Sequence, residues 1–144
     1  MWSVSSSGRY RGVIYHHENF VIDGNEAGSS FVTEFETLPW FQIDFAVSLD
    51  AIAVVEVFKR GSFFERFFDV EVRIGEVRTE VSFGRQRIEY NQLCYNYGDA
   101  DLDTNPEVMP CASLLRGRYL TLQKLNYGTL SFQEIHVYRT TVGQ

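Results

Sequence analysis

The chain has 144 residues, the length of one ordinary domain, and 44% of them are hydrophobic, enough to bury a core. The net charge of -6 argues against a nucleic-acid binder and against a domain that docks on anionic lipid. No apolar run approaches the roughly 20 residues that a bilayer-spanning helix needs. Aromatic residues make up 15% of the chain, which favours strands. The composition predicts a single all-β domain over residues 1–144.

The first strong strand signal lies at residues 39–45. The apolar side chains of Phe41, Ile43 and Phe45 fall on one face of an extended chain. The polar side chains of Gln42 and Asp44 fall on the other face. This alternation with a period of two predicts a strand with one buried face.

Five further segments are predicted strands. Residues 52–58 are almost continuously apolar, as in the core of a sandwich, and residues 68–74 alternate until Gly75 ends them. No stretch shows helical apolar spacing over three turns. Short strands separated by turn residues indicate an antiparallel sandwich or barrel. The remaining predicted strands are residues 77–83, 119–122 and 132–138.

The two cysteines bracket the longest segment without a strand signal, residues 96–110. A disulfide between Cys94 and Cys111 would stabilise the fold by roughly 3 kcal/mol through loop closure. Such a bond needs an oxidising compartment. The alternative is a pair of buried free thiols.

Five segments carry short motifs: VIDGN at 21–25, PWFQIDF at 39–45, RG at 60–61, GRYL at 117–120 and LSFQEIHV at 130–137. In this order they resemble the motifs of the F-type lectins (fucolectins), a branch of the discoidin-like jelly rolls. The resemblance extends over residues 3–138. It implies an antiparallel jelly-roll sandwich from a secreted protein or an ectodomain, and a disulfide at the positions of Cys94 and Cys111.

A second family disulfide is missing. Ser30 and Gln133 stand at the two positions where the family has its other cysteine pair. Because both partners are replaced together, no odd thiol remains. The joint loss supports the resemblance.

The resemblance also implies a calcium ion shared by the D-G-N loop and the last strand. Ca²⁺ takes six to eight hard oxygen ligands and accepts backbone carbonyls as readily as carboxylates. The alternative is that the D-G-N tripeptide forms only a tight turn around its glycine. The implied carboxylate ligands are Asp23 and Glu134, and the implied carbonyl or hydroxyl ligands are Phe20, Asn25, Ser29 and Gln133.

The family binds fucose through a histidine that 26 residues separate from an Arg-x-Asp-x4-Arg/Lys motif. Arg60 matches the first arginine, and Arg66 matches the second cation one residue early. Ser62 stands at the position of the aspartate. A serine cannot orient an arginine as a carboxylate does, because it is neutral and makes no bidentate pair.

The histidine position is also changed. Counting back from Arg60 reaches Thr33, whose side chain is shorter than histidine. Phe63 and Phe64 replace the vicinal cysteines of the family and retain an apolar surface. The resemblance therefore predicts a glycan or glycoprotein partner and a fucose site that is altered or weakened.

Two other kinds of function compete with this prediction. A protein-interaction or adhesion module of the same fold could have lost sugar binding, and the residues at 33 and 62 favour it. Membrane docking through the aromatic residues of 62–68 is disfavoured by the acidic charge and by the expectation that Phe68 is part of the core. The sequence carries no nucleophile-plus-base signature and no phosphate loop, so an enzyme is not expected.

Overall fold

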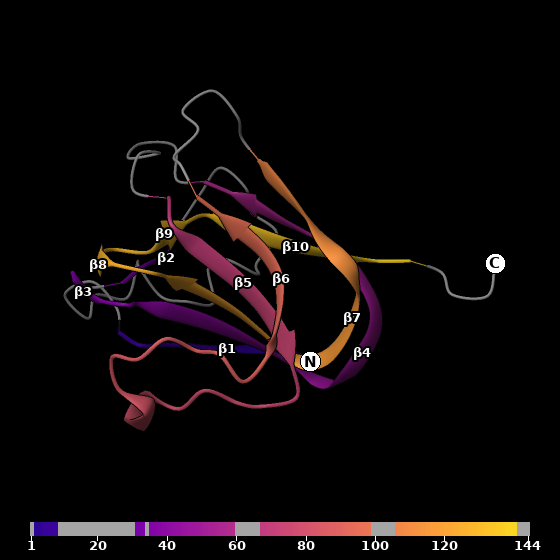
Figure 1. Cartoon of the computed structure of the whole chain (residues 1–144), viewed down its shortest axis with the longest axis horizontal. Helices are drawn as coiled ribbons and strands as arrows, with labels where there is room; N and C mark the ends of the chain where they lie inside the picture. Colours follow the sequence, from indigo (N-terminus) through magenta and orange to yellow (C-terminus); the bar gives the residue numbers. More distant parts are fainter. Residues whose placement is uncertain (1, 9–30, 34, 60–66, 99–105, 141–144) are drawn as a thin grey trace.

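A computed structural model describes residues 2–8, 31–33, 35–59, 67–98 and 106–140 (Figure 1). Nearly all regular structure in these residues is β-strand, as predicted. No helix in the described part of the chain is long and apolar enough to cross a membrane. The elements are β1 Ser3–Ser6, β2 Phe31–Val32, β3 Glu36–Thr37, β4 Trp40–Phe58, β5 Val70–Gly75, the 3-10 turn Val81–Phe83, β6 Gln92–Tyr97, β7 Glu107–Lys124, β8 Tyr127–Gly128, β9 Ser131–Phe132 and β10 Glu134–Arg139.

The long strands β4 and β7 belong to one hydrogen-bonded sheet, in the order β1-β4-β7-β5-β6 with β10 beside β4, and this sheet bends into two layers, called sheet I and sheet II below. The two long strands pair antiparallel from Trp40 opposite Gln123 to Val57 opposite Glu107. Register shifts interrupt the pairing between residues 44 and 54, and both ribbons curve there, on the right of Figure 1. Such irregularities bend a strand and let it continue in a second layer. Sheet I consists of β1, residues 40–44 of β4, residues 117–124 of β7, β5 and β6, and sheet II consists of β10, residues 52–58 of β4 and residues 107–115 of β7.

One hydrophobic core lies between the two sheets. Ile43, Val72 and Leu122 enter it from sheet I. Val57 and Met109 enter it from sheet II, and all five side chains are completely buried. Burying an aliphatic side chain of this size stabilises a fold by about 1.5–3 kcal/mol. The inward positions of the predicted strands therefore do form the core.

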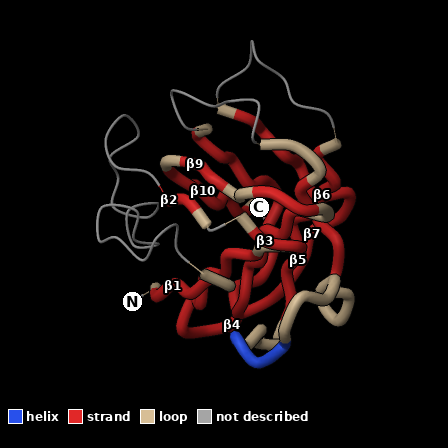
Figure 2. The backbone as a smooth tube through the Cα atoms, turned by 90° about the vertical axis from the view of Figure 1, so that its left-hand side faces the viewer, coloured by secondary structure: helices blue, strands red, loops and turns tan. Residues whose placement is uncertain are grey.

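The outer face of sheet I is covered as well, which the sequence did not predict. Gln42 and Asp44 point away from the core, yet they are only 1% and 8% exposed. Residues 76–91, the covering segment, lie over this face. Figure 2 shows them with the 3-10 turn in blue at the outer edge of the molecule. The Gln42 amide accepts a hydrogen bond from Thr79 N–H (2.7 Å) and donates one to Thr79 O (3.2 Å).

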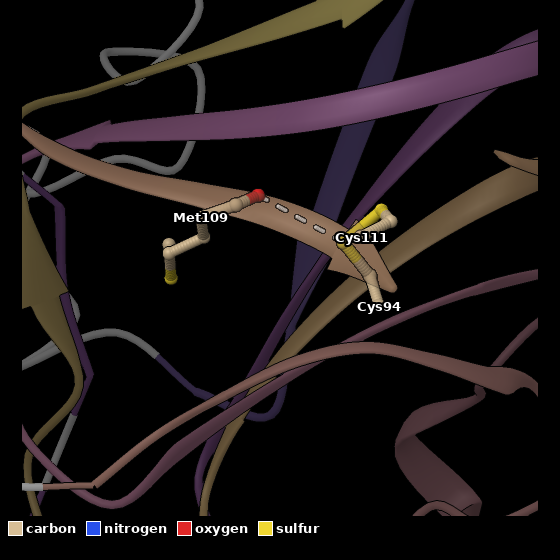
Figure 3. The surroundings of a disulfide bond; sticks show 3 residues. All are labelled: Cys94, Met109 and Cys111. Atoms are coloured by element: carbon tan, nitrogen blue, oxygen red, sulfur yellow. Dashed lines mark hydrogen bonds between the residues drawn. A yellow bond between two sulfur atoms is a disulfide. The ribbon is translucent and has the colours of Figure 1, made fainter. Parts of the chain in front are cut away.

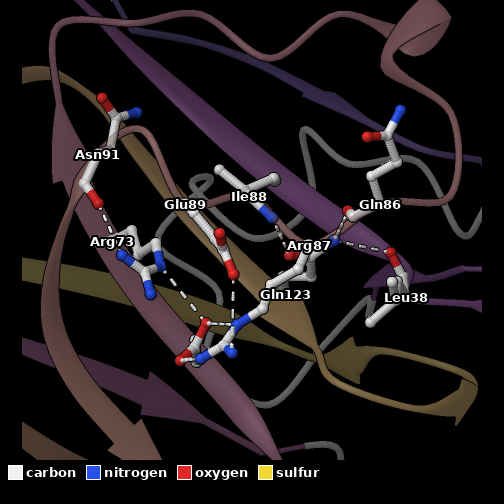
Figure 4. Close-up of polar contacts among 9 residues, drawn as sticks. Leu38, Arg73, Gln86, Arg87, Ile88, Glu89, Asn91 and Gln123 are labelled. Carbon is white, nitrogen blue, oxygen red and sulfur yellow. Dashed lines mark hydrogen bonds and ion pairs between the residues drawn. The ribbon is translucent and has the colours of Figure 1, made fainter.

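Gln123 anchors the rest of the covering segment (Figure 4). Its amide oxygen accepts from Ile88 N–H at 2.8 Å. Its amide nitrogen donates to Gln86 O at 2.8 Å and to Leu38 O at 3.1 Å. Within residues 77–83, Val77 and Thr79 bond to the side chains of Asn91 and Gln42, and Val81–Phe83 form the 3-10 turn, so the prediction of a strand there is wrong.

Two glycines let the strands of sheet I approach closely. A Cβ atom on Gly117 would lie 2.6 Å from the backbone nitrogen and oxygen of Gly75. A Cβ atom on Gly75 would in turn collide with the Asn91 side chain. Gly117 belongs to the GRYL motif, so its residue type has a steric reason here.

Other strand boundaries also differ from the predictions. The strands predicted at 39–45 and 52–58 form a single strand, β4, which begins at Trp40, and β6 was not predicted at all. The predicted loop 96–110 is shorter, because Asn96 and Tyr97 extend β6 and β7 begins at Glu107. Pro110 is tolerated within β7 because it lies beside a register shift in β4, where the ladder is already irregular.

Candidate functional site

The residues predicted to bind sugar lie mostly outside the described ranges. Only Thr33 is described, and its side chain is completely buried. Its hydroxyl oxygen accepts a hydrogen bond from Leu130 N–H at 2.8 Å, and its own N–H donates to Leu130 O at 3.0 Å. Thr33 therefore links β2 to β9, a structural role that the sequence did not indicate. The positions outside the described ranges are Arg60, Ser62, Phe63, Phe64 and Arg66.

A buried polar cluster fixes the residue before this predicted sugar-binding segment. Lys59, which follows β4, is 0% exposed, and its Nζ lies 3.0 Å from Glu107 Oε1 at the start of β7. Tyr97 at the end of β6 donates its hydroxyl to the same oxygen at 3.0 Å. A buried lysine is stable only when a charge or hydrogen-bond acceptor compensates its lost hydration. The cluster joins three strand ends at one edge of the sandwich.

Aromatic packing holds the other end of this segment. Phe67 is 1% exposed, with its ring centroid 5.2 Å from that of Tyr97. Phe68, in contrast, is only half-buried, so Phe67 and not Phe68 is the core residue. The reversal arises because Asp69 has a positive φ of 53° and delays the start of β5 to Val70.

Lys124, the last residue of β7, is buried against Phe68. Its Nζ lies 3.3 Å from the centre of the Phe68 ring and donates to Phe68 O at 3.1 Å. Burial lowers the pKa of Lys124 to about 8, although the negative charge of Asp69 acts in the opposite direction. The ring and the carbonyl partly replace the hydration that the ammonium group has lost.

Asn126, in the turn after β7, bonds to two residues whose backbones adopt the left-handed conformation. Asn126 Nδ2 donates to Asp69 Oδ2 at 2.6 Å, and Asn126 O accepts from Leu38 N–H at 3.2 Å. Leu38 has a φ of 54°, unusual for a bulky residue, and Asp69 has a φ of 53°. Strained backbones persist where several contacts determine them, and they are common at binding sites.

Of the six positions implied for calcium, Gln133 and Glu134 are described. Glu134 lies on the same face of β10 as Tyr138, but it is 1% exposed whereas Tyr138 is 48% exposed. Gln133 donates its N–H to Phe58 O at 2.7 Å, which fixes the backbone beside Glu134. A buried carboxylate and a backbone carbonyl are both oxygen donors that Ca²⁺ accepts, so Glu134 and the carbonyl of Gln133 fit the ion. Phe20, Asp23, Asn25 and Ser29 lie outside the described ranges.

Among the described residues, no three His, Cys, Asp or Glu side chains form a group that could hold a metal ion. The prediction of calcium remains a prediction, since four of its six ligand positions are not described.

The predicted disulfide between Cys94 and Cys111 is present (Figure 3). It joins β6 of sheet I to the part of β7 that belongs to sheet II. Cys94 Sγ also lies 4.0 Å from Met109 O, which is a contact and not a hydrogen bond because a disulfide sulfur has no hydrogen. Neither described cysteine is free. The bond thus crosslinks the two layers directly, inside the strands and not at the loop.

Two of the motif segments meet in the structure. Asp44 of the PWFQIDF motif and Arg118 of the GRYL motif form a bidentate pair, with Nε–Oδ1 at 2.7 Å and Nη2–Oδ2 at 3.1 Å. The hydrogen bond from Arg118 lowers the pKa of Asp44, and the N–H of Ala46 acts in the same direction against the effect of burial. This aspartate and arginine therefore stabilise sheet I.

A cavity of about 170 Å³ lies near the start of β4, and the sequence did not reveal it. Glu36, Arg85 and Ser7 supply its polar groups. Glu36 is 7% exposed, in contrast to the usual exposure of glutamates. These residues come from β3, the covering segment and the end of β1, three segments that no local motif connects.

The sequence matches no family model and no curated protein. Its fold, however, is close to solved structures of carbohydrate-binding modules. A fucolectin (F-lectin) from the serum of the striped bass, Morone saxatilis, has a TM-score of 0.76 and 21% identity, over 97% of this chain and 46% of that chain. The present chain therefore spans less than half of the striped bass lectin chain.

Two further structures match over nearly their whole length. The lectin domain of lectinolysin, solved with Lewis B antigen, has a TM-score of 0.73 and 19% identity, over 96% of this chain and 93% of that chain. A family 32 CBM from C. perfringens NanJ, solved with galactose, has a TM-score of 0.72 and 12% identity, over 96% of this chain and 93% of that chain. The chain thus has the antiparallel jelly-roll fold of F-type lectins and discoidin-like modules, as the motifs predicted.

Proposed function

We propose that this chain is an extracellular, calcium-stabilised recognition module that binds glycans through an altered or weakened fucose-type site. The observation that carries the proposal is the fold, shared over 96–97% of the chain with a fucolectin and with a lectin domain solved with Lewis B antigen. No catalytic residues are part of it. The disulfide between Cys94 and Cys111 supports an oxidising, extracellular location.

The proposed site is centred on Arg60 and Arg66. Guanidinium groups donate several hydrogen bonds to sugar hydroxyl and ring oxygens, and Phe63 with Phe64 offers an apolar surface to a sugar methyl group. The described residues on either side of residues 60–66, Lys59 and Phe67, are both buried in the cluster around Tyr97.

Free L-fucose is expected to bind weakly. Thr33 is buried and bonds to Leu130, so it does not replace the family's histidine as a donor. Ser62 leaves Arg60 less oriented, so its side-chain entropy is lost on binding. Each change costs about 1–2 kcal/mol, and together they weaken binding roughly thirty- to several-hundredfold.

A glycan array probed with and without calcium tests the function. Glycan binding should be lost in the variant Arg60→Ala. It should persist in Arg139→Ala, a control that removes one exposed arginine elsewhere. Titration calorimetry with L-fucose then tests the weakened site. A dissociation constant tighter than about 0.1 mM that Arg60→Ala abolishes would contradict it, because such affinity requires a full set of donors.

The calcium part of the proposal rests on the burial of Glu134. With Gln133 O, and with oxygens of Phe20, Asp23, Asn25 and Ser29, its carboxylate would hold the ion. When bound, calcium neutralises this buried carboxylate and stabilises the native state, because the unfolded chain lacks the site. The melting temperature should rise with calcium and fall with a chelator. Asp23→Ala or Glu134→Gln should remove the response and Glu56→Gln should retain it. A response equal in all variants would refute the assignment.

A second candidate is a protein-interaction or adhesion module of the same fold. The observation that favours it is that the Thr33 hydroxyl accepts a hydrogen bond from the backbone N–H of Leu130 and so does not replace the family's histidine as a donor to a sugar. An array without glycan signal, together with a melting temperature that still responds to calcium, would decide for this alternative.

A further inference from the structure

The cavity near the start of β4 contains a carboxylate that is more than nine-tenths buried. Glu36 is 7% exposed. Its Oε1 accepts a hydrogen bond from the Ser7 hydroxyl at 2.5 Å, and its Oε2 accepts one from Arg85 Nη1 at 2.9 Å. Each carboxylate oxygen has a second lone pair. Glu36 therefore lines the cavity with strong acceptors, and Arg85 lines it with strong donors.

The walls of this cavity are held by contacts that do not depend on a ligand. Ser7 is fixed to the start of β4, because Trp40 N–H donates to Ser7 Oγ at 2.9 Å and Ser7 N–H donates to Trp40 O at 3.0 Å. Leu38, with its left-handed backbone, is held by Gln123 Nε2 at its carbonyl oxygen (Figure 4). A second bond from the same amide fixes Gln86 O, next to Arg85. A pre-formed site loses little conformational entropy on binding.

The charge of the cavity selects the ligand. Arg85 neutralises Glu36, so the site has no net charge. The Arg85 side chain is 60% exposed, which leaves most of its five N–H donors facing solvent. An anion would meet the Glu36 carboxylate and a cation would meet the guanidinium. A neutral ligand with neighbouring hydroxyl groups can accept from Arg85 and donate to Glu36 at the same time.

The size of the cavity limits the ligand further. About 170 Å³ is below the range of roughly 300–1,000 Å³ that holds drug-sized molecules. It has room for one ring and not for an oligosaccharide. Thr37 and Gly84 also line the cavity.

We propose that the Glu36–Arg85 cavity is a binding site for one neutral monosaccharide unit, in addition to the site proposed at residues 60–66. The choice of a sugar as the hydroxylated ring rests on the proposed function. The site itself rests on the buried carboxylate, its guanidinium partner and the fixed walls.

Chemical-shift titration of the ¹⁵N-labelled chain tests the proposal. The probes are L-fucose, D-galactose and N-acetylgalactosamine, with the anionic N-acetylneuraminic acid as the charged comparison. At least one neutral sugar should shift the amides of Ser7, Thr37, Gly84 and Arg85 in a saturable way. The anionic sugar should leave them unmoved. Equal shifts with the anionic sugar would overturn the neutral-ligand assignment.

Arg85→Ala should weaken this binding by about tenfold, as expected for the loss of a charge-assisted donor. Arg87→Ala is the matched control, because Arg87 lies on the same segment and also pairs with a buried glutamate, Glu71, but does not line the cavity. Arg85→Lys keeps the charge beside Glu36 and so protects the fold, and it should bind with intermediate affinity.

The two proposals fail in different ways. If sugars shift only amides next to residues 60–66 and only Arg60→Ala weakens binding, the second site is wrong and the proposed function stands. If the cavity amides shift and Arg60→Ala has no effect, the second site stands and the site at residues 60–66 is wrong. No shift anywhere up to about 50 mM, well above the millimolar range of weak sites, would overturn both.

Discussion

Polar residues are usually exposed and large apolar residues are usually buried, but the outer faces of the two sheets show the reverse. On sheet I the outward residues Gln42, Asp44 and Gln123 are polar and 8% exposed or less. On sheet II the outward residues Val108 and Tyr138 are 55% and 48% exposed. The covering segment lies over sheet I, whereas Val108 and Tyr138 of sheet II are not covered by the described residues.

This difference shows what outward polar residues can do in a sandwich. The side-chain amides of Gln42 and Gln123 bond to backbone groups of residues 79–88. These backbone groups of the covering segment therefore have hydrogen-bond partners although the segment is not a strand. Buried backbone groups require such partners. A polar face of a strand can therefore be exposed to solvent or covered by a segment that its side chains bind. The alternation of polar and apolar residues alone does not distinguish these two cases.

The largest expected effect comes from breaking the strand packing beneath the covering segment. Gly117→Ala would place a Cβ atom 2.6 Å from the Gly75 backbone, which cannot yield as a side chain can. We expect a loss of about 4 kcal/mol or more in the free energy of unfolding, measured by urea denaturation. Gly84→Ala is the control. Gly84 has a φ of 80° and open space around it, so the cost should be only about 1 kcal/mol. Equal losses would show that the close approach does not matter.

Removing the crosslink between the sheets should have the next largest effect. Replacing Cys94 and Cys111 together with alanine should cost about 3 kcal/mol. Hydrogen exchange should accelerate more in residues 92–97 and 107–112, next to the bond, than in residues 119–124. Two free thiols per chain in the unfolded, unreduced protein would contradict the bond itself.

A direct comparison of the two faces uses one side chain from each half of β4. Gln42→Ala leaves the buried backbone of Thr79 without its partners and should cost about 2 kcal/mol. Glu56→Ala, on the open face of sheet II, removes bonds to Tyr138 and His136 but allows water to replace them, and should cost about 1 kcal/mol or less. Denaturant midpoints of both variants test the difference, and a larger loss for Glu56 would reverse the argument.

The smallest effect concerns pH. The Arg118 hydrogen bond keeps the pKa of Asp44 below 3.8, so its contribution is complete above that pH and is lost as the pH falls through the folded-state pKa. Asp44→Asn should lower stability at pH 7 and flatten the acid limb of the stability curve. Asp50 is the matched comparison: Arg139 lowers its pKa too, but both groups are exposed, so added salt should remove its effect. Salt that removes both effects would show that burial does not protect the Asp44 pair.

Much of the fold could be predicted from local sequence. The alternation over residues 39–45 and 68–74 identified core side chains such as Ile43 and Val72, because inward positions repeat with the pleat. The cysteine pair was predicted correctly from its position, and the order of the motifs indicated the jelly roll. Strand β6 was missed because residues 92–97 alternate weakly, with Leu93 42% exposed and Cys94 buried.

The sequence by itself determined the all-β class, the inward core positions and the disulfide, because each depends on residue type and short spacing. Only the tertiary structure decided which outer face is covered and where charged groups meet. Glu36 and Arg85 are 49 residues apart, and Lys59 and Glu107 are 48 apart. Their pairing depends on how β3, β4, β7 and the covering segment pack. Buried polar contacts of this kind arise from long-range packing, and the periodicity of a strand carries no information about them.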